Sequence, residues 1–291
     1  MSNTNFIPEF VSRRSFIELH ARERAQSLLD PGSYRELAGP FERMESPWLP
    51  AQGIAPQSDD GCVVLKGTIS KQPVVVIALE GGFQAGSMGE VSGAKLTAAL
   101  DLAARDSANG TKTSAVLLLE TGGVRLQEAN LGLAAIAEAI ASLLALRQYA
   151  PIITVVAGTI GCFGGMSLVA GLSSYVVMTP EARLGLNGAE VIEQESGIEE
   201  FDASDRALIW AINGGEQRVA MGVADELVDD DAHKIAASVR RFIEAGLPRT
   251  HRSDQVEIYR RRVAELNVST QFNPLSLRES WGNMPTAGDT K

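Results

Sequence analysis

Three apolar segments of this 291-residue chain are each followed by a glycine-rich turn and then by a helical pattern, and this repeated order constrains the fold most strongly. The turns lie at 81–89, 122–123 and 161–165. Apolar segments without polar interruptions are typical of strands buried on both faces, and their alternation with helices is typical of a parallel sheet. The sequence therefore predicts an α/β fold whose three turns meet at the carboxyl edge of the sheet, where such sheets bind ligands.

The elements around these turns follow from local patterns. Two β-branched segments flanking residues 70–72 predict a hairpin. The helix expected at 90–106 carries four apolar residues on one face: Val91, Ala94, Ala98 and Leu102. A longer helix is expected from Arg125 to Tyr149, and further strands are expected at 115–120, 152–158 and 174–178.

Both ends of the chain are expected to add helices to this core. The spacings Ser15 to Glu18 and Ser33 to Glu36 are those of capping boxes, and each predicts the start of a helix. Amphipathic patterns predict two more helices after residue 231, and the last two dozen residues are expected to be a disordered tail or one that orders on contact. The expected division is 1–60 for the N-terminal helices and linker, 61–246 for the core domain, and 247–291 for the C-terminal helix and tail.

Charge and cysteine content exclude several classes of protein. A net charge of -10 argues against nucleic acid, because such binding depends on lysines and arginines that contact phosphates. The two cysteines, Cys62 and Cys162, form no zinc-binding or disulfide pattern. No secretory signal or apolar segment of membrane-spanning length is visible, so we expect a soluble, cytoplasmic protein without a membrane or metal site.

The paired glycines predict a specific chemistry. Adjacent glycines at a strand-to-helix turn leave consecutive N–H groups uncovered, and a helix N-terminus adds partial positive charge. Gly122 with Gly123 and Gly164 with Gly165 could therefore converge on one oxygen as an oxyanion hole. The alternative is that each pair only allows a strand and a helix to pack closely.

The motifs around these glycines resemble a known family. GGFQAGSMGEVSGAK, ETGGVRLQEA, GCFGGMS and LGLNGAEVIEQ occur in the order found in the β-subunit type of acyl-CoA carboxyltransferases, which belong to the crotonase-like superfamily. ARERAQSLLDPGSYREL resembles their N-terminal signature, and SPWLPAQGIAPQSDDG is similar to the malonate decarboxylase branch, whose β subunits the chain resembles most. The resemblance spans about residues 12–245 and implies a crotonase-like spiral of ββα units.

The resemblance also implies an activity and partners. Malonyl carried as a phosphopantetheine-type thioester on an acyl carrier protein would be decarboxylated to the acetyl thioester, with no cofactor bound covalently by this chain. The implied partners are a homologous γ subunit of the same fold that shares the active site, the acyl carrier protein and an acyltransferase α subunit. The amides of Gly122 and Gly123 would face the thioester oxygen, and Gly164 and Gly165 would supply the half of the pocket at the helix terminus, although which pair holds which group stays open.

Neighbouring side chains have two interpretations each. Phe83 and Gly86 could line a slot for the pantetheine arm, or Phe83 could belong to the core. Arg125 could receive a carboxylate or phosphate, or it could pair with Glu128. Glu128 could be an acid or base, or it could complement a helix dipole.

A nucleophile is the weaker hypothesis. Cys162 precedes a helix start, which can lower a thiol pKa, but a small residue filling a tight turn is the favoured interpretation. The three histidines, His20, His233 and His251, lie outside the glycine turns, which argues against a catalytic triad.

Two rival functions remain open from the sequence. The first is a biotin-dependent carboxyltransferase β subunit that moves the carboxyl group to biotin. The second is a non-catalytic scaffold whose turns only bind the carrier protein. The four-cysteine zinc ribbon of bacterial acetyl-CoA carboxylase β subunits is absent, which disfavours that identity.

Overall fold

The structure, a computed structural model, describes residues 13–267 and 273–282. In this part of the chain, one sheet holds seven strands in sequential order. They are β1 (Arg35–Leu37), β2 (Cys62–Ile69), β3 (Gln72–Leu79), β4 (Ser114–Leu118), β5 (Ile152–Val156), β6 (Tyr175–Met178) and β7 (Glu226–Leu227). The predicted hairpin is confirmed, because β2 and β3 pair antiparallel around Ser70 and Lys71.

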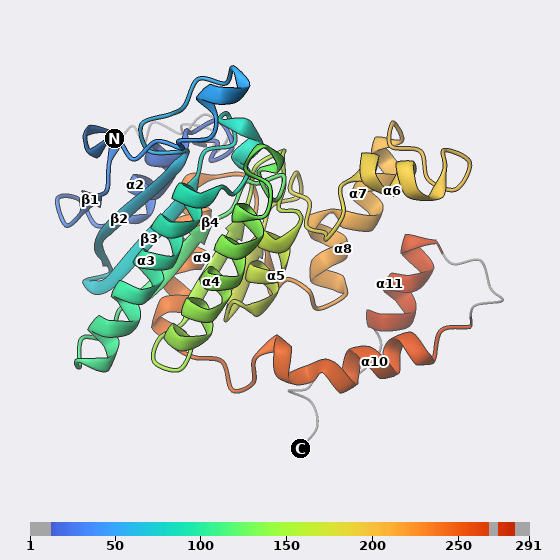
Figure 1. Cartoon of the computed structure of the whole chain (residues 1–291). Helices are drawn as coiled ribbons and strands as arrows, with labels where there is room; N and C mark the ends of the chain where they lie inside the picture. The colour runs from blue at the N-terminus through green and yellow to red at the C-terminus, as the bar shows by residue number, and fades with distance from the viewer. Residues whose placement is uncertain (1–12, 268–272, 283–291) are drawn as a thin grey trace, which may run out of the picture.

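The strands from β3 to β7 are parallel, so their carboxyl ends share one edge. The crossovers between them contain α3 (Glu90–Ala108), α4 (Leu131–Leu146) and α5 (Gly165–Leu172). Because crossovers are right-handed and the strand order advances in one direction, these helices all cover the same face of the sheet. Figure 1 shows α3 and α4 side by side in front of the strands.

The opposite face of the sheet is covered by α2 (Ala21–Leu28) and α9 (Ala232–Ala245). Two apolar cores result, one between the sheet and α3 to α5, and the other between the sheet and α2 with α9. Every residue of β4 and β5 is buried, which confirms the prediction of a sheet covered on both faces.

Smaller helices extend the fold beyond α5, to the right of and below it in Figure 1. They are α6 (Ala189–Ser196), α7 (Arg206–Asn213), α8 (Gly215–Ala220), α10 (Val256–Ala264) and α11 (Pro274–Gly282). The disordered alternative for the tail is wrong for α11, where Trp281 is buried and Arg278 donates to the Gln217 side chain of α8 at 2.9 Å. The remaining tail residues and the N-terminal start lie outside the described residues. None of the described helices combines the length and apolarity that crossing a membrane requires.

The first expected helix begins later than predicted. The Ser15 hydroxyl does accept the Glu18 N–H at 3.3 Å, but the N–H groups of Phe16 and Ile17 donate to the Asp230 carboxylate. The chain therefore turns there, and α2 starts at Ala21.

The second expected helix is wrong. Residues 35–37 form β1, which pairs with β2 so that Glu36 lies opposite Leu65. Its carboxylate accepts hydrogen bonds from Arg22 of α2, and an edge strand wins over the local capping signal.

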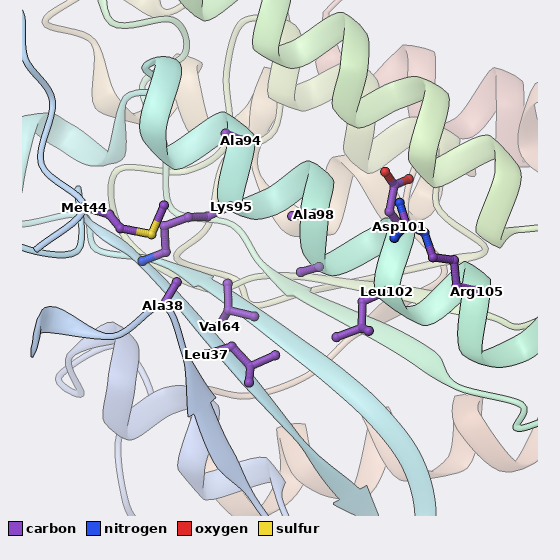
Figure 2. A pocket seen from close by; sticks show the side chains of 11 residues that line it. Leu37, Ala38, Met44, Val64, Ala94, Lys95, Ala98, Asp101, Leu102 and Arg105 are labelled. Atoms are coloured by element: carbon purple, nitrogen blue, oxygen red, sulfur yellow. The ribbon is translucent and has the colours of Figure 1, made fainter. Parts of the chain in front are cut away.

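The buried face of α3 also differs from the prediction. Ala94 and Ala98 are exposed, and with Leu102 they line a groove of about 480 Å³ between α3 and the segment around β1 (Figure 2). The buried residues of α3 are instead Ser92, Gly93, Lys95, Leu96, Ala99, Leu100 and Ala103. Alanines on two sides of this helix made the spacing ambiguous, because a small apolar residue suits either face.

Candidate functional site

The three glycine turns meet at the carboxyl edge of the sheet, as predicted. Short backbone pairings join them: Thr121 pairs with Cys162 and Met88 pairs with Val124. The Thr121 N–H donates to Gly161 O at 2.8 Å, and the Met88 N–H donates to Gly123 O at 2.8 Å. The segments that follow β3, β4 and β5 therefore form one connected layer above the strand ends.

Gly123 and Gly164 are in direct contact within this layer. Both have positive φ, at 120° and 61°, and a Cβ added to Gly164 would lie 3.0 Å from Gly123 Cα. A Cβ at Gly164 would press the two turns apart, whereas one at Gly123 would lie at an ordinary 3.5 Å from Gly164 Cα but would still require positive φ. This contact joins two turns rather than a strand and a helix, and it brings the two predicted halves of the site together.

The predicted set of uncovered amides is only partly present. The Gly122 N–H donates to Ala85 O at 2.8 Å and the Gly164 N–H donates to Leu186 O at 2.8 Å, while the Gly123 N–H reaches Thr121 Oγ1 at 3.1 Å. The hydrogen bonds to Ala85 and Leu186 were not predicted, because these two acceptors belong to other segments of the chain. Gly165 is different: it begins α5, and its N–H has no acceptor among the described residues. The same holds for the next N–H, that of Met166.

The unpaired N–H groups of Gly165 and Met166 give the site one clear electrostatic feature. The first N–H groups of a helix carry the positive end of its dipole and point away from the helix. Gly165 is half-buried, so its N–H lies in a shielded environment where a hydrogen bond to an anionic oxygen is strengthened. The arrangement can stabilise negative charge on a small substrate oxygen.

Gly86 holds the first turn against the second. It is buried with φ of 63°, and an added Cβ would lie 1.8 Å from Glu120 O. This approach places Ala85 O where it accepts the Gly122 N–H. Phe83 is half-buried and lies under the Arg125 guanidinium, 5.2 Å from the ring centroid. Both residues therefore shape the turn, and their contact with a pantetheine arm stays a prediction.

Arg125 is engaged within the protein. Its side chain is 1% exposed, and Nη1 lies 2.6 Å from Asp60 Oδ1 and 2.9 Å from Glu128 Oε1. Pairing with Glu128 was one of the two interpretations, and the geometry supports it over an open receptor for a substrate anion. Asp60 was not predicted as a partner of Arg125, because it lies at the end of the linker.

Glu128 connects this cluster to α3 and the linker. Its carboxylate accepts the Ser46 hydroxyl at 2.6 Å and the Glu90 N–H at 2.6 Å, the latter at the start of α3. Burial raises the pKa of Glu128, but these hydrogen bonds and the Arg125 charge outweigh burial and hold that pKa below its usual range. An ionised carboxylate with saturated partners is a structural anchor, so the dipole interpretation fits better than acid or base catalysis.

The long helix also starts later than predicted. Residues 126–128 form a separate 3₁₀ turn, and α4 begins at Leu131. The Arg125 cluster holds this turn out of the helix, and Glu128 complements the N-terminus of α3 rather than that of its own helix.

Cys162 fits the interpretation of a small residue in a tight turn. The residue is fully buried, and burial raises its thiol pKa far above the usual value, so the thiolate nucleophile is absent at neutral pH. No group of histidines, cysteines and carboxylates suited to a metal occurs among the described residues.

A second buried ion pair beneath the turns was not predicted. Arg24 of α2 pairs with Glu120, which directly precedes the second glycine turn. Glu120 fits because Gly81 and Gly158 have no side chains: a Cβ on Gly158 would lie 1.9 Å from Glu120 Oε1. The glycines were visible in the sequence, but their contact with Glu120 depends on strands that are remote along the chain.

Comparisons with known proteins agree with this geometry. Residues 17–279 match the family model described as "Carboxyl transferase domain". The chain is 37% identical to the malonyl-S-ACP:biotin-protein carboxyltransferase MADC of Malonomonas rubra, over 93% of this chain and 89% of that protein. It also matches a chain of a Pseudomonas malonate decarboxylase hetero-tetramer in complex with malonate, at 55% identity and a TM-score of 0.91, over 94% of this chain and 99% of that one.

A chain of a Pseudomonas malonate decarboxylase MdcD-MdcE hetero-dimer matches as well. The identity is 50% and the TM-score is 0.75, over 89% of this chain and all of that one. These matches confirm the predicted crotonase-like α/β fold.

Proposed function

The chain belongs to the carboxyl transferase domain family, and on this premise we propose that it is a malonate decarboxylase subunit acting on malonyl-S-acyl-carrier-protein. The identity of 55% to a malonate decarboxylase chain supports this substrate. In the reaction, the bond between the carboxylate carbon and the α-carbon breaks, CO₂ leaves, and the electron pair becomes a thioester enolate. A proton then converts the enolate to acetyl-S-acyl-carrier-protein.

The chief catalytic demand is stabilisation of the enolate oxygen. That oxygen gains negative charge in the transition state, so a donor aimed at it lowers the barrier selectively. One donor of this kind is typically worth about 3 to 4 kcal/mol. The observation that supports the proposal is the unoccupied Gly165 N–H at the positive end of α5, beside the junction of the glycine turns.

The four glycines then take different roles. Gly165, with Met166 behind it, donates to the thioester oxygen. Gly123 and Gly164 bring the two turns into contact, and the Gly123 N–H makes the longest of the three hydrogen bonds, to the Thr121 hydroxyl at 3.1 Å. Gly122 anchors its turn to Ala85.

The active complex is proposed to be a hetero-oligomer. The matched Pseudomonas chains come from a hetero-tetramer and a hetero-dimer. We infer a homologous γ subunit, an acyl carrier protein that carries the phosphopantetheine-type thioester, and an acyltransferase α subunit. Copurification of the chain from its source, followed by mass spectrometry, tests this composition: recovery of the chain alone would contradict it.

A biotin-dependent carboxyltransferase is the second candidate, because the relative MADC is named for transfer to a biotin protein. The two candidates differ in what happens to the carboxyl group. Decarboxylation releases CO₂ without an acceptor, whereas the transferase needs biotin. Adding malonyl thioester to the assembled complex with avidin distinguishes them: we expect undiminished CO₂ release, and a stalled reaction would establish the transferase instead.

A further inference from the structure

A cavity of about 550 Å³ adjoins the third glycine turn, residues 161–165, and contains two arginines. Its lining includes Thr159, Arg183, Glu190, Arg206 and Trp210. A backbone hydrogen bond joins this turn to the cavity lining, because the Cys162 N–H donates to Arg183 O at 2.8 Å. A molecule bound in this cavity would therefore lie next to the candidate site.

Arg183 is fixed in place but has no carboxylate partner among the described residues. Its guanidinium lies over two aromatic rings, 5.5 Å from the centroid of Phe163 and 4.5 Å from that of Trp210. Nη2 donates to Thr159 O at 2.8 Å, whereas the buried Nε has no acceptor. A buried donor without a partner is costly, and it indicates a missing ligand or water.

Arg206 is also without an ion pair in the described part of the chain. It is exposed at the start of α7 and its charge reaches Arg183. Desolvation lowers the pKa of Arg183, Glu190 raises it and Arg206 lowers it further, so these three groups interact electrostatically. Arginines keep their charge in proteins, which leaves a net positive charge on the lining.

The geometry points to a binding site for a phosphate ester, and specifically for the phosphate of the pantetheine arm that carries the malonyl group. This inference rests on the proposed function. Planar guanidinium groups suit phosphate and carboxylate alike, but an arginine pair on the malonyl carboxylate would stabilise the ground state and oppose loss of CO₂. The phosphate keeps its charge throughout the reaction, so binding it secures the substrate without that penalty.

The test uses two soluble substrates that differ only in the phosphate: malonyl-S-phosphopantetheine and malonyl-S-pantetheine. In the assembled complex, Arg206→Gln is expected to raise KM for the first about tenfold or more, with kcat unchanged, and to leave KM for the second unchanged. Arg206→Lys should retain part of the effect, and Glu190→Gln should lower KM for the phosphorylated substrate. Arg249→Gln, which removes an exposed arginine elsewhere, is the matched control.

Three outcomes would overturn the inference. An equal rise in KM for both substrates would assign the arginines to the carboxylate, and no rise for either would leave the cavity without this role. Inorganic phosphate, titrated calorimetrically, tests the cavity without turnover: equal affinity for wild type and Arg206→Gln would also refute it. Failure of the wild type to decarboxylate either substrate would instead refute the proposed function, while the phosphate titration would still judge the cavity.

Discussion

The centre of the sheet and its carboxyl edge are stabilised by different means. In β4 and β5, every side chain is buried and most are apolar, so hydrophobic burial holds the centre together. At the edge, the backbone turns touch through glycines, and two ion pairs are buried, Arg24 with Glu120 and Arg125 with Asp60. Hydrophobic burial stabilises the centre, whereas backbone contacts and buried ion pairs fix the positions of the turns at the edge.

This difference determines how each region responds to substitution. Apolar packing tolerates small losses of volume, each at a modest cost in free energy. Close backbone contacts and buried ion pairs tolerate substitution much less well. A close backbone contact has no room to relax, and an unpaired buried charge lacks solvation. Substitutions at the edge should therefore impair activity, whereas substitutions at the centre should reduce the free energy of unfolding alone.

The largest effect is expected for Gly164→Ala. The new Cβ would lie 3.0 Å from Gly123 Cα at a residue with positive φ, so the two turns must move apart. Misplacement by about 1 Å can cost about 100-fold in kcat, and we expect a loss approaching this because the strain of positive φ on alanine adds to the close contact. Gly171→Ala, later in α5, is the control, since its Cβ would meet nothing within 4 Å. Equal decarboxylation by both variants would contradict the role of the glycine contact.

The next effect is expected for Arg125→Met. It leaves Asp60 and Glu128 buried without their cation, which costs about 3 to 5 kcal/mol of the free energy of unfolding. Arg260→Ala removes an exposed pair with Glu257 and should cost less than about 1 kcal/mol. Urea unfolding of both variants measures the difference, and similar costs would show that the buried cluster is not an anchor.

At the centre, Ile77→Val is expected to have a smaller effect. Ile77 of β3 is fully buried, and loss of one methylene there costs about 0.5 to 1.5 kcal/mol. Because the strand lies below the turns, kcat should stay at the wild-type value. A clear fall in kcat would mean that the centre and the edge are not separable.

The smallest effect is expected for Cys162→Ala. The thiol is buried with a raised pKa, so its loss should leave turnover within about twofold of wild type. Steady-state kinetics of the complex checks this. A loss of activity beyond tenfold would revive the nucleophile hypothesis.

The sequence predicted what depends on local patterns. Apolar strands, glycine turns and their common edge could all be predicted, because buried strands require apolar residues and positive φ favours glycine. The Ser33 to Glu36 spacing misled, since β1 formation depends on β2, which is remote along the chain. Three other partners could not be predicted for the same reason. Ala85 reaches the Gly122 amide, Leu186 reaches the Gly164 amide and Asp60 reaches Arg125 only in the folded chain.

Paired substitutions at Gly165 test whether its N–H stabilises the enolate oxygen. Gly165→Pro removes the N–H at the first helical position, where proline is well tolerated, and Gly165→Ala adds a comparable Cβ against Ile136 while keeping the N–H. The account predicts that kcat for malonyl thioester decarboxylation is about 100-fold lower in the proline variant than in the alanine variant. Equal kcat values would contradict it.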